Sequence, residues 1–153
     1  MIRPALTWQR LRELRRLPPA ERRLLVRAAV WLLAVDLGLR TLGFTRLRRL
    51  LARGAGRAPE SIAQASWWPE AETIARSVGT AARHHLYPMT CLTRSLVLWR
   101  LLARRGIPSD LQIGVRKDDR SILAHAWVEC AGRPVAEPQD VGHRFAAVGL
   151  PAS

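Results

Sequence analysis

Hydrophobic residues recur at helical spacing through the first two thirds of this 153-residue chain. Apolar side chains that return every three to four residues line one face of a helix, so this pattern indicates a series of helices. The stretches that follow it predict helices over residues 6–17, 19–42, 45–52, 69–85 and 91–105. The last of these is apolar on most faces, which predicts that it lies at the centre of the fold.

Residues with strong positional preferences indicate where these helices begin and end. Pro19 and Pro69 are expected in a first helical turn, where the missing N–H of proline costs nothing. Thr45 and Thr90 are candidate N-caps, because a threonine hydroxyl accepts a hydrogen bond from a free N–H of the first turn. Gly43 is a natural C-terminal cap of the second helix.

The spacing changes from helical to alternating after residue 106. Alternating apolar and polar residues predict strands over residues 111–116 and 121–130, and a third strand is expected over 134–137. A helical N-terminal half followed by a small antiparallel sheet is an α+β fold with segregated elements, unlike the alternation of a nucleotide-binding fold. The sequence has no glycine-rich phosphate loop, so it gives no support to an ATP or NAD site, and no cofactor is expected.

The net charge of the chain is large and unevenly distributed. Lys and Arg number 25 against 12 Asp and Glu, which gives a formal charge of +13 and first points to a nucleic acid or an anionic membrane as partner. Residues 1–57 hold +11 of that charge and residues 58–153 only +2. The sequence therefore predicts a basic helical docking segment over 1–57 and a nearly neutral domain over 58–153, with a hinge at 54–59.

The cysteines and the N-terminal sequence indicate in which cellular compartment the protein is expected. Cys91 and Cys130 are the two cysteines, and no Cys/His group has zinc-ligand spacing. The N-terminal sequence is Arg-rich and amphipathic and lacks the apolar region of a signal peptide. Its longest uncharged apolar run, residues 28–35, has eight residues, whereas a membrane span needs about 20. We therefore expect a cytoplasmic protein with no structural metal site.

The second half of the chain contains the side chains of a cysteine nucleophile and its helpers. Cys91 is predicted in the first turn of the central helix, where free N–H groups and the helix dipole stabilise a thiolate. His125 lies in the second predicted strand, and Glu137 across a tight turn is preferred over Asp140 to orient the imidazole. The simpler interpretation is that such a cysteine and histidine are core residues, as Cys130 is expected to be.

Three blocks of sequence contain or flank these residues. They are PMTCLTRSLVLWRLLARRGI at 88–107, DLQIGVR at 110–116 and HAWVE at 125–129. In this order they resemble the transglutaminase-like leader peptidases of lasso-peptide biosynthesis, and the resemblance covers residues 60–147. It implies a papain-like, transglutaminase-like cysteine protease fold for the predicted domain that begins at residue 58.

The resemblance also implies roles and partners. Cys91 matches the nucleophile of the family and His125 its general base, whereas Glu137 stands where the family usually has Asp. Such a peptidase removes the leader from a ribosomally made precursor peptide before a separate ATP-dependent cyclase closes the macrolactam ring. A winged-helix leader-recognition domain, fused or separate, presents the leader. Residues 1–57 lack the hairpin signals of that domain, so a separate recognition protein is expected.

Two other functions fit the same sequence. An acyltransferase of transglutaminase type would pass the acyl group from Cys91 to an amine instead of water. A non-catalytic module would bind an anionic membrane or a nucleic acid through its basic helices, with Cys91 buried in the core. For the peptidase no nucleic acid is expected, and residues 1–57 would dock on the recognition protein, an acidic leader or the inner membrane surface.

Overall fold

The structure is a computed structural model that describes residues 18–53, 64–85, 87–118 and 121–148. The helix expected over residues 6–17 and the hinge expected at 54–59 lie outside the described residues. The helices of the structure are α2 (Pro19–Leu42), α3 (Phe44–Arg53), α4 (Gln64–Arg83), α5 (Cys91–Arg104) and α6 (Val141–Arg144).

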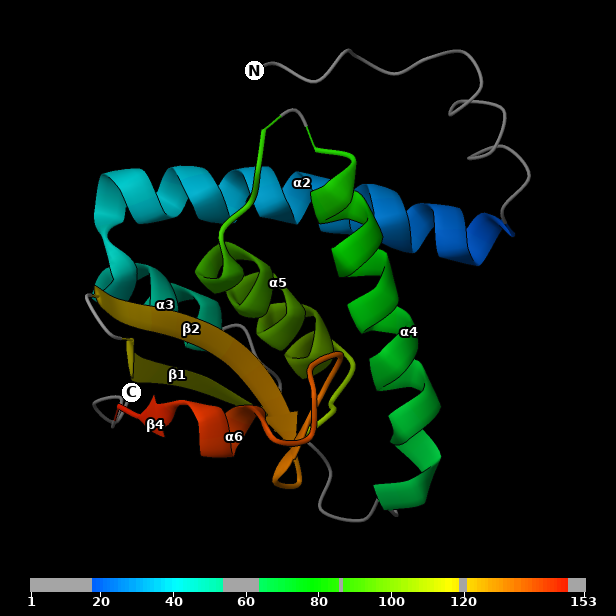
Figure 1. The fold of residues 1–153 in the computed structure, drawn as a ribbon. Coiled ribbons are helices and arrows are strands. Elements are labelled where there is room, and N and C mark those ends of the chain that lie inside the picture. The colour runs from blue at the N-terminus through cyan, green and yellow to red at the C-terminus, as the bar shows by residue number, and fades with distance from the viewer. Residues whose placement is uncertain (1–17, 54–63, 86, 119–120, 149–153) are drawn as a thin grey trace.

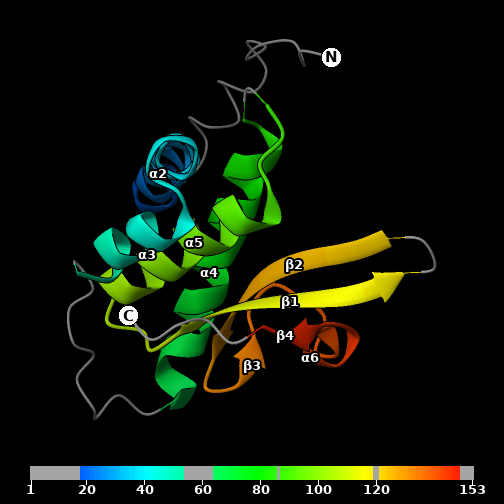
Figure 2. The same cartoon turned by 90° about the vertical axis from the view of Figure 1, so that its left-hand side faces the viewer.

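The helix α5 lies at the centre of the molecule, with α2 and α4 packed against it and against each other (Figure 1). The strands β1 (Asp110–Asp118) and β2 (Ser121–Cys130) form a long antiparallel hairpin that extends away from the helices (Figure 2). Two short strands, β3 (Arg133–Pro134) and β4 (Ala146–Ala147), complete an antiparallel sheet of order β3-β2-β1-β4.

The outer edge of β2 is only partly paired. β3 pairs with Glu129 and Cys130 at the C-terminal end of β2, and the backbone N–H of Val135 donates to the carbonyl oxygen of Val128. No strand in the described residues continues this pairing toward the start of β2. We call residues 121–127 along this side the open edge of β2.

A single hydrophobic core joins the helices to the sheet. Its fully or almost fully buried members come from α2, α4, α5 and the sheet: Ala28, Leu32, Val35, Ala71, Ile74, Leu96, Val97, Leu102, Val128 and Cys130. Burying a Leu, Ile or Val side chain stabilises a fold by roughly 1.5–3 kcal/mol. The helix α2 therefore belongs to the same core as α5, and the division of the chain at residue 57 stays a prediction.

Most of the predicted elements are present in the structure. The helices expected over 19–42 and 91–105 occur as α2 and α5, and Thr90 caps α5 as expected. The strand expected over 121–130 is β2, and the helices followed by an antiparallel sheet confirm the α+β class. No helix in the described ranges is both long and apolar enough to cross a membrane.

Three local predictions were wrong, and two short elements were not predicted. Thr45 is not an N-cap, because α3 already begins at Phe44. Pro69 does not open α4: the helix begins five residues earlier, at Gln64, and its Trp67 is buried in the core. Tertiary burial of a tryptophan here outweighs the preference of proline for a helix start. The strand expected over 134–137 is reduced to β3, and the pattern did not predict α6 or β4.

The shared core predicts unequal effects of two leucines on α2. Leu32 is fully buried, whereas Leu37 is 63% exposed. We expect Leu32→Ala to lower the free energy of unfolding by about 2–5 kcal/mol, because it removes apolar contacts and leaves a cavity. Leu37→Ala, the matched control, should change it by less than about 0.5 kcal/mol. Urea unfolding followed by circular dichroism measures both values, and equal values would contradict the placement of α2 in the core.

Candidate active site

Cys91 is the first residue of α5, and a helix cap fixes this position. The side-chain oxygen of Thr90 accepts a hydrogen bond from the backbone N–H of Thr93, with 3.1 Å between nitrogen and oxygen. The first turn of a helix has N–H groups without partners in the helix, and the helix dipole favours negative charge there. Cys91 is partly exposed and forms no disulfide, so its thiol is accessible at this end of α5.

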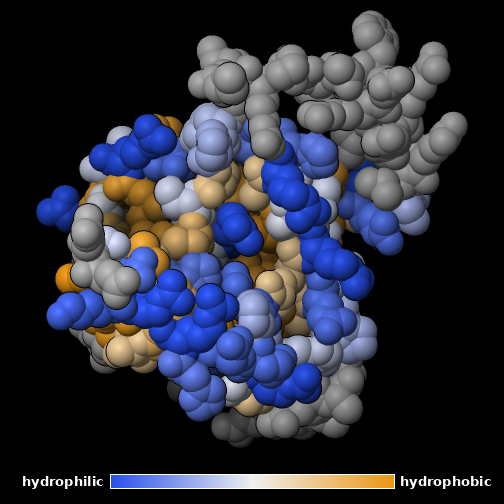
Figure 3. Space-filling model, viewed as in Figure 1, coloured by the Kyte–Doolittle hydropathy of each residue, from blue (hydrophilic) through white to orange (hydrophobic). Residues whose placement is uncertain are grey.

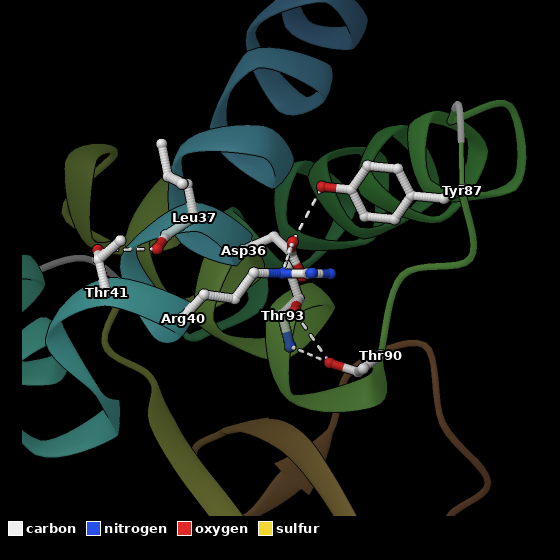
Figure 4. A network of polar contacts seen from close by, with 7 residues as sticks. All are labelled: Asp36, Leu37, Arg40, Thr41, Tyr87, Thr90 and Thr93. Atoms are coloured by element: carbon white, nitrogen blue, oxygen red, sulfur yellow. Dashed lines mark hydrogen bonds and ion pairs between the residues drawn. The ribbon is translucent and has the colours of Figure 1, made fainter.

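The segment that leads into Cys91 is bound to α2 through the buried residue Asp36 (Figure 4). The Tyr87 hydroxyl donates to Asp36 Oδ2 at 2.9 Å, and Arg40 Nε donates to the same oxygen at 2.8 Å. This hydrogen bond to Asp36 raises the pKa of Tyr87, with smaller contributions from burial and from the negative charge of the carboxylate. A side chain of α2 therefore holds the chain just before the start of α5.

The N-terminal half of α5 lies at the open edge of β2. The hydroxyl of Ser95 donates to the carbonyl oxygen of Ala126 at 2.8 Å, in a buried contact. Carbonyl groups two residues apart in a strand point to the same side, and the carbonyl of Val128 faces β3. The Ala126 carbonyl therefore faces the open edge, where Ser95 replaces a missing strand. This contact places the first turns of α5 beside the stretch of β2 that contains His125.

The structure brings His125 and Glu137 together. His125 Nε2 lies 3.4 Å from Glu137 Oε2, and the two side chains are 24% and 23% exposed. The residue before Glu137, Ala136, has a φ of 58°, in the left-handed region that side chains other than glycine seldom adopt. This turn after β3 directs the carboxylate to the imidazole. Nδ1 of His125 forms no hydrogen bond within the described part of the chain.

His125 also belongs to a cluster of three aromatic rings. Its centroid lies 6.2 Å from that of Trp127, with nearly parallel planes, and 5.3 Å from that of Phe145. Gly114 pairs with His125 across the hairpin, and a Cβ there would lie 2.7 Å from Phe145 Cβ and 2.9 Å from the Trp127 ring. A side chain at position 114 would therefore displace the rings that pack around the imidazole.

Neither Glu129 nor Asp140 contacts His125. Glu129 accepts a hydrogen bond from Trp127 Nε1 at 2.8 Å, and Asp140 is an exposed residue at the start of α6. Among the residues that the structure describes, no hydrogen bond joins the thiol of Cys91 to the imidazole of His125. The described ranges also contain no group of three or more His, Cys, Asp or Glu residues placed to hold a metal ion.

The second cysteine lies in a different environment. Cys130 is fully buried at the end of β2, within the hydrophobic core. Burial raises the pKa of its thiol to about 11, and the negative charge of Asp110 acts in the same direction. Because the thiolate is the reactive form of cysteine, Cys130 is unreactive at neutral pH. The structure thus agrees with the sequence interpretation of Cys130 as a structural residue.

Several residues around the site were missed by sequence reasoning. Ser95 and Gly114 each carried a signal: a serine within an apolar helix needs a partner when it is buried, and a glycine inside a strand marks a close approach. Tyr87 and Phe145 carried none, because their contacts join segments that are far apart in the sequence. Their roles follow from tertiary packing alone.

The contrast between the two cysteines predicts a selective modification. Iodoacetamide at about pH 8 should label native protein once, at Cys91, because Cys130 is inaccessible and its pKa is about 11. Protein unfolded in urea should take two labels. Peptide mapping by mass spectrometry identifies the modified residue. Label on Cys130 of native protein, or none on Cys91, would contradict the exposure described above.

The close packing beside His125 predicts that one added methyl group lowers the stability of the fold. Gly114→Ala should lower the free energy of unfolding by about 1–3 kcal/mol, because the added Cβ overlaps Phe145 and Trp127. The matched control is Gly142→Ala, whose Cβ would meet only Glu129 at 3.9 Å. Thermal unfolding of the two variants measures the difference. An equal effect of both substitutions would show that the ring cluster yields to the methyl group.

A match to a known protein family covers nearly all of the described structure. Residues 29–149 match the family model of the transglutaminase-like superfamily, and this range includes Cys91, His125 and Glu137. The superfamily includes cysteine peptidases and acyltransferases. No match was found among curated proteins or among solved structures. Because the family model covers well over half of the chain, from α2 through β4, the protein belongs to the transglutaminase-like superfamily.

Proposed function

We propose that the protein is a cysteine peptidase that removes the leader from a ribosomally made lasso-peptide precursor. The observation that supports this most strongly is the pairing of His125 Nε2 with Glu137 at 3.4 Å. A carboxylate at one ring nitrogen orients the imidazole and leaves the other nitrogen to act as base. The blocks at 88–107, 110–116 and 125–129, which resemble leader peptidases, favour this substrate class.

In the proposed reaction, His125 takes the proton of the Cys91 thiol, and the thiolate attacks the carbonyl carbon of the bond between leader and core. Free N–H groups at the start of α5 stabilise the resulting oxyanion. The C–N bond breaks as His125 gives its proton to the departing amine of the core peptide, which leaves the leader as a thioester on Cys91. Water, deprotonated by His125, hydrolyses the thioester and restores the thiol.

Binding of the substrate completes the contact between thiol and imidazole in this proposal. Catalytic hydrogen bonds are often long or absent without substrate and form in the Michaelis complex. The tether from Tyr87 to Asp36 and the contact from Ser95 to Ala126 hold the two sides of the site in place while this contact forms.

We further propose that a separate winged-helix leader-recognition protein docks on α2 and presents the leader. Val26, Val30, Leu33 and Leu37 follow one face of α2 at spacings of four, three and four residues, and all four side chains are exposed. An exposed apolar row of this kind is typical of a surface that packs against another helix. The many arginines of residues 1–57 would add attraction to an acidic partner.

Substitution of the three candidate catalytic residues tests the proposed reaction. Cys91→Ala should lower the rate of leader cleavage by a factor on the order of 10⁴ or more, because no nucleophile remains. His125→Ala should cause a similar loss, and Glu137→Ala a smaller one. Asp140→Ala is the matched control and should keep the activity, since Asp140 does not contact His125. Mass spectrometry of precursor incubated with the protein, with and without the recognition protein, measures the products.

The outcomes separate the alternatives. Cleavage by the Cys91→Ala variant, with its fold intact by circular dichroism, would refute Cys91 as the nucleophile. Absence of cleavage by the wild-type protein, with and without the recognition protein, would refute the peptidase and favour a binding module. A larger loss from Asp140→Ala than from Glu137→Ala would show that Asp140 orients the imidazole. A product whose mass shows the leader joined to an added amine would show acyl transfer in place of hydrolysis.

A further inference from the structure

A cavity of about 280 Å³ opens between α4, α5 and the chain that follows β3. Figure 3 shows a hollow with an apolar floor in this region, bordered by hydrophilic side chains of α4. The floor includes Val78, Leu98 and Val128. The volume is at the lower end of the roughly 300–1,000 Å³ of small-molecule pockets, which suits one or two peptide side chains better than a cofactor.

The cavity adjoins the candidate active site. Glu137 lines the cavity and lies 3.4 Å from His125. Arg94 and Ser95 of α5 also line it, and they follow Cys91 by three and four residues, which places them one helical turn beyond the thiol. A peptide bound across Cys91 and His125 can therefore extend a neighbouring side chain into this space.

The charge of the cavity is positive. Three arginines line it, Arg76, Arg83 and Arg94, against one acidic residue, Glu137, which faces His125. Arg76 and Arg83 each donate to a threonine hydroxyl of their own helix at 3.0 Å. In the described ranges, none of the three guanidinium groups forms an ion pair. Most of their N–H donors are thus available to a carboxylate, the group that guanidinium binds best.

One of the residues of α4 that line the cavity is a glycine. Gly79 lies within the helix, where glycine is less favourable than alanine by about 1 kcal/mol. A Cβ at this position would meet only the side chain of Arg83, at an ordinary contact distance of 3.6 Å. Helix packing therefore does not require this glycine, and a longer side chain at this position would extend toward the cavity that Gly79 lines.

We infer that this cavity is a substrate subsite that takes an acidic side chain, Asp or Glu, of the peptide next to the cleaved bond. The inference rests on the proposed peptidase function, because it places the substrate across Cys91 and His125. Arg83 and Arg94 approach the carboxylate from α4 and α5, and the apolar floor contacts the methylene groups of the side chain. The charge of the cavity then contributes to the choice of cleavage site.

Selection from a peptide library tests the subsite without catalysis. Cys91→Ala protein is incubated with a random library of synthetic peptides, and bound peptides are identified by mass spectrometry. We expect Asp and Glu to be enriched at one position by about tenfold over Asn and Gln, a ratio typical of one charge-assisted contact. Arg83→Gln together with Arg94→Gln should remove the enrichment, while Arg49→Gln, an exposed control on α3, should keep it.

The size of the cavity gives a second readout. Gly79→Leu should place a side chain in the cavity and abolish the acidic preference, whereas Gly79→Ala should retain it. Circular dichroism checks that both variants are folded. Absence of any acidic enrichment, or its survival in the double arginine variant, would overturn the subsite. If acidic peptides are selected but wild-type protein leaves them and the precursor uncut, the subsite stands as a binding site and the peptidase proposal fails.

Discussion

The hydroxyl of Ser95 satisfies the carbonyl of Ala126 at the open edge of β2. A buried carbonyl without a partner costs roughly 1–3 kcal/mol, so α5 cannot move away from this edge without that loss. The contact holds the N-terminal half of α5 beside the stretch of β2 that contains His125. The chain that follows β3 contains Glu137, whose carboxylate lies beside His125 of the same strand. The elements of the candidate site are therefore arranged around one unpaired stretch of strand.

The helix α5 is apolar on most faces and yet contributes to a polar site, because its two ends of interaction are separate: the core holds the helix, and polar contacts hold its start. Leu96, Val97 and Leu102 bind α5 into the core on several sides, so its orientation does not depend on polar contacts at its N-terminal end. Thr90 caps that end, and Asp36 holds the preceding segment through Tyr87. The hydrophobic core supplies stability, and the polar contacts at the helix start set the position of Cys91.

Local sequence signals were sufficient for most of the long elements. Caps such as Thr90 and the alternation in β2 act over a few residues, so they can be detected without knowledge of the fold. Pro69 was misleading because the burial of Trp67 extends α4 toward its N-terminus, a tertiary effect with no local signal. The preference for Glu137 over Asp140 agrees with the geometry, yet the catalytic roles remain proposals. The ring cluster around His125 could not be predicted, because Phe145 lies just before β4, which is distant in the sequence and is not a neighbour of β2 in the sheet.

The three-ring cluster has a thermodynamic consequence for His125. An imidazole on a solvated strand samples several rotamers, and fixing one of them costs conformational entropy when a ligand binds. Trp127 and Phe145 restrict those rotamers in the folded protein, and Gly114 gives them the room to do so. The entropy of ordering this ring is therefore lost on folding, before any substrate arrives. A glycine inside β1 lowers strand stability, and the molecule gains from it an imidazole that is already oriented.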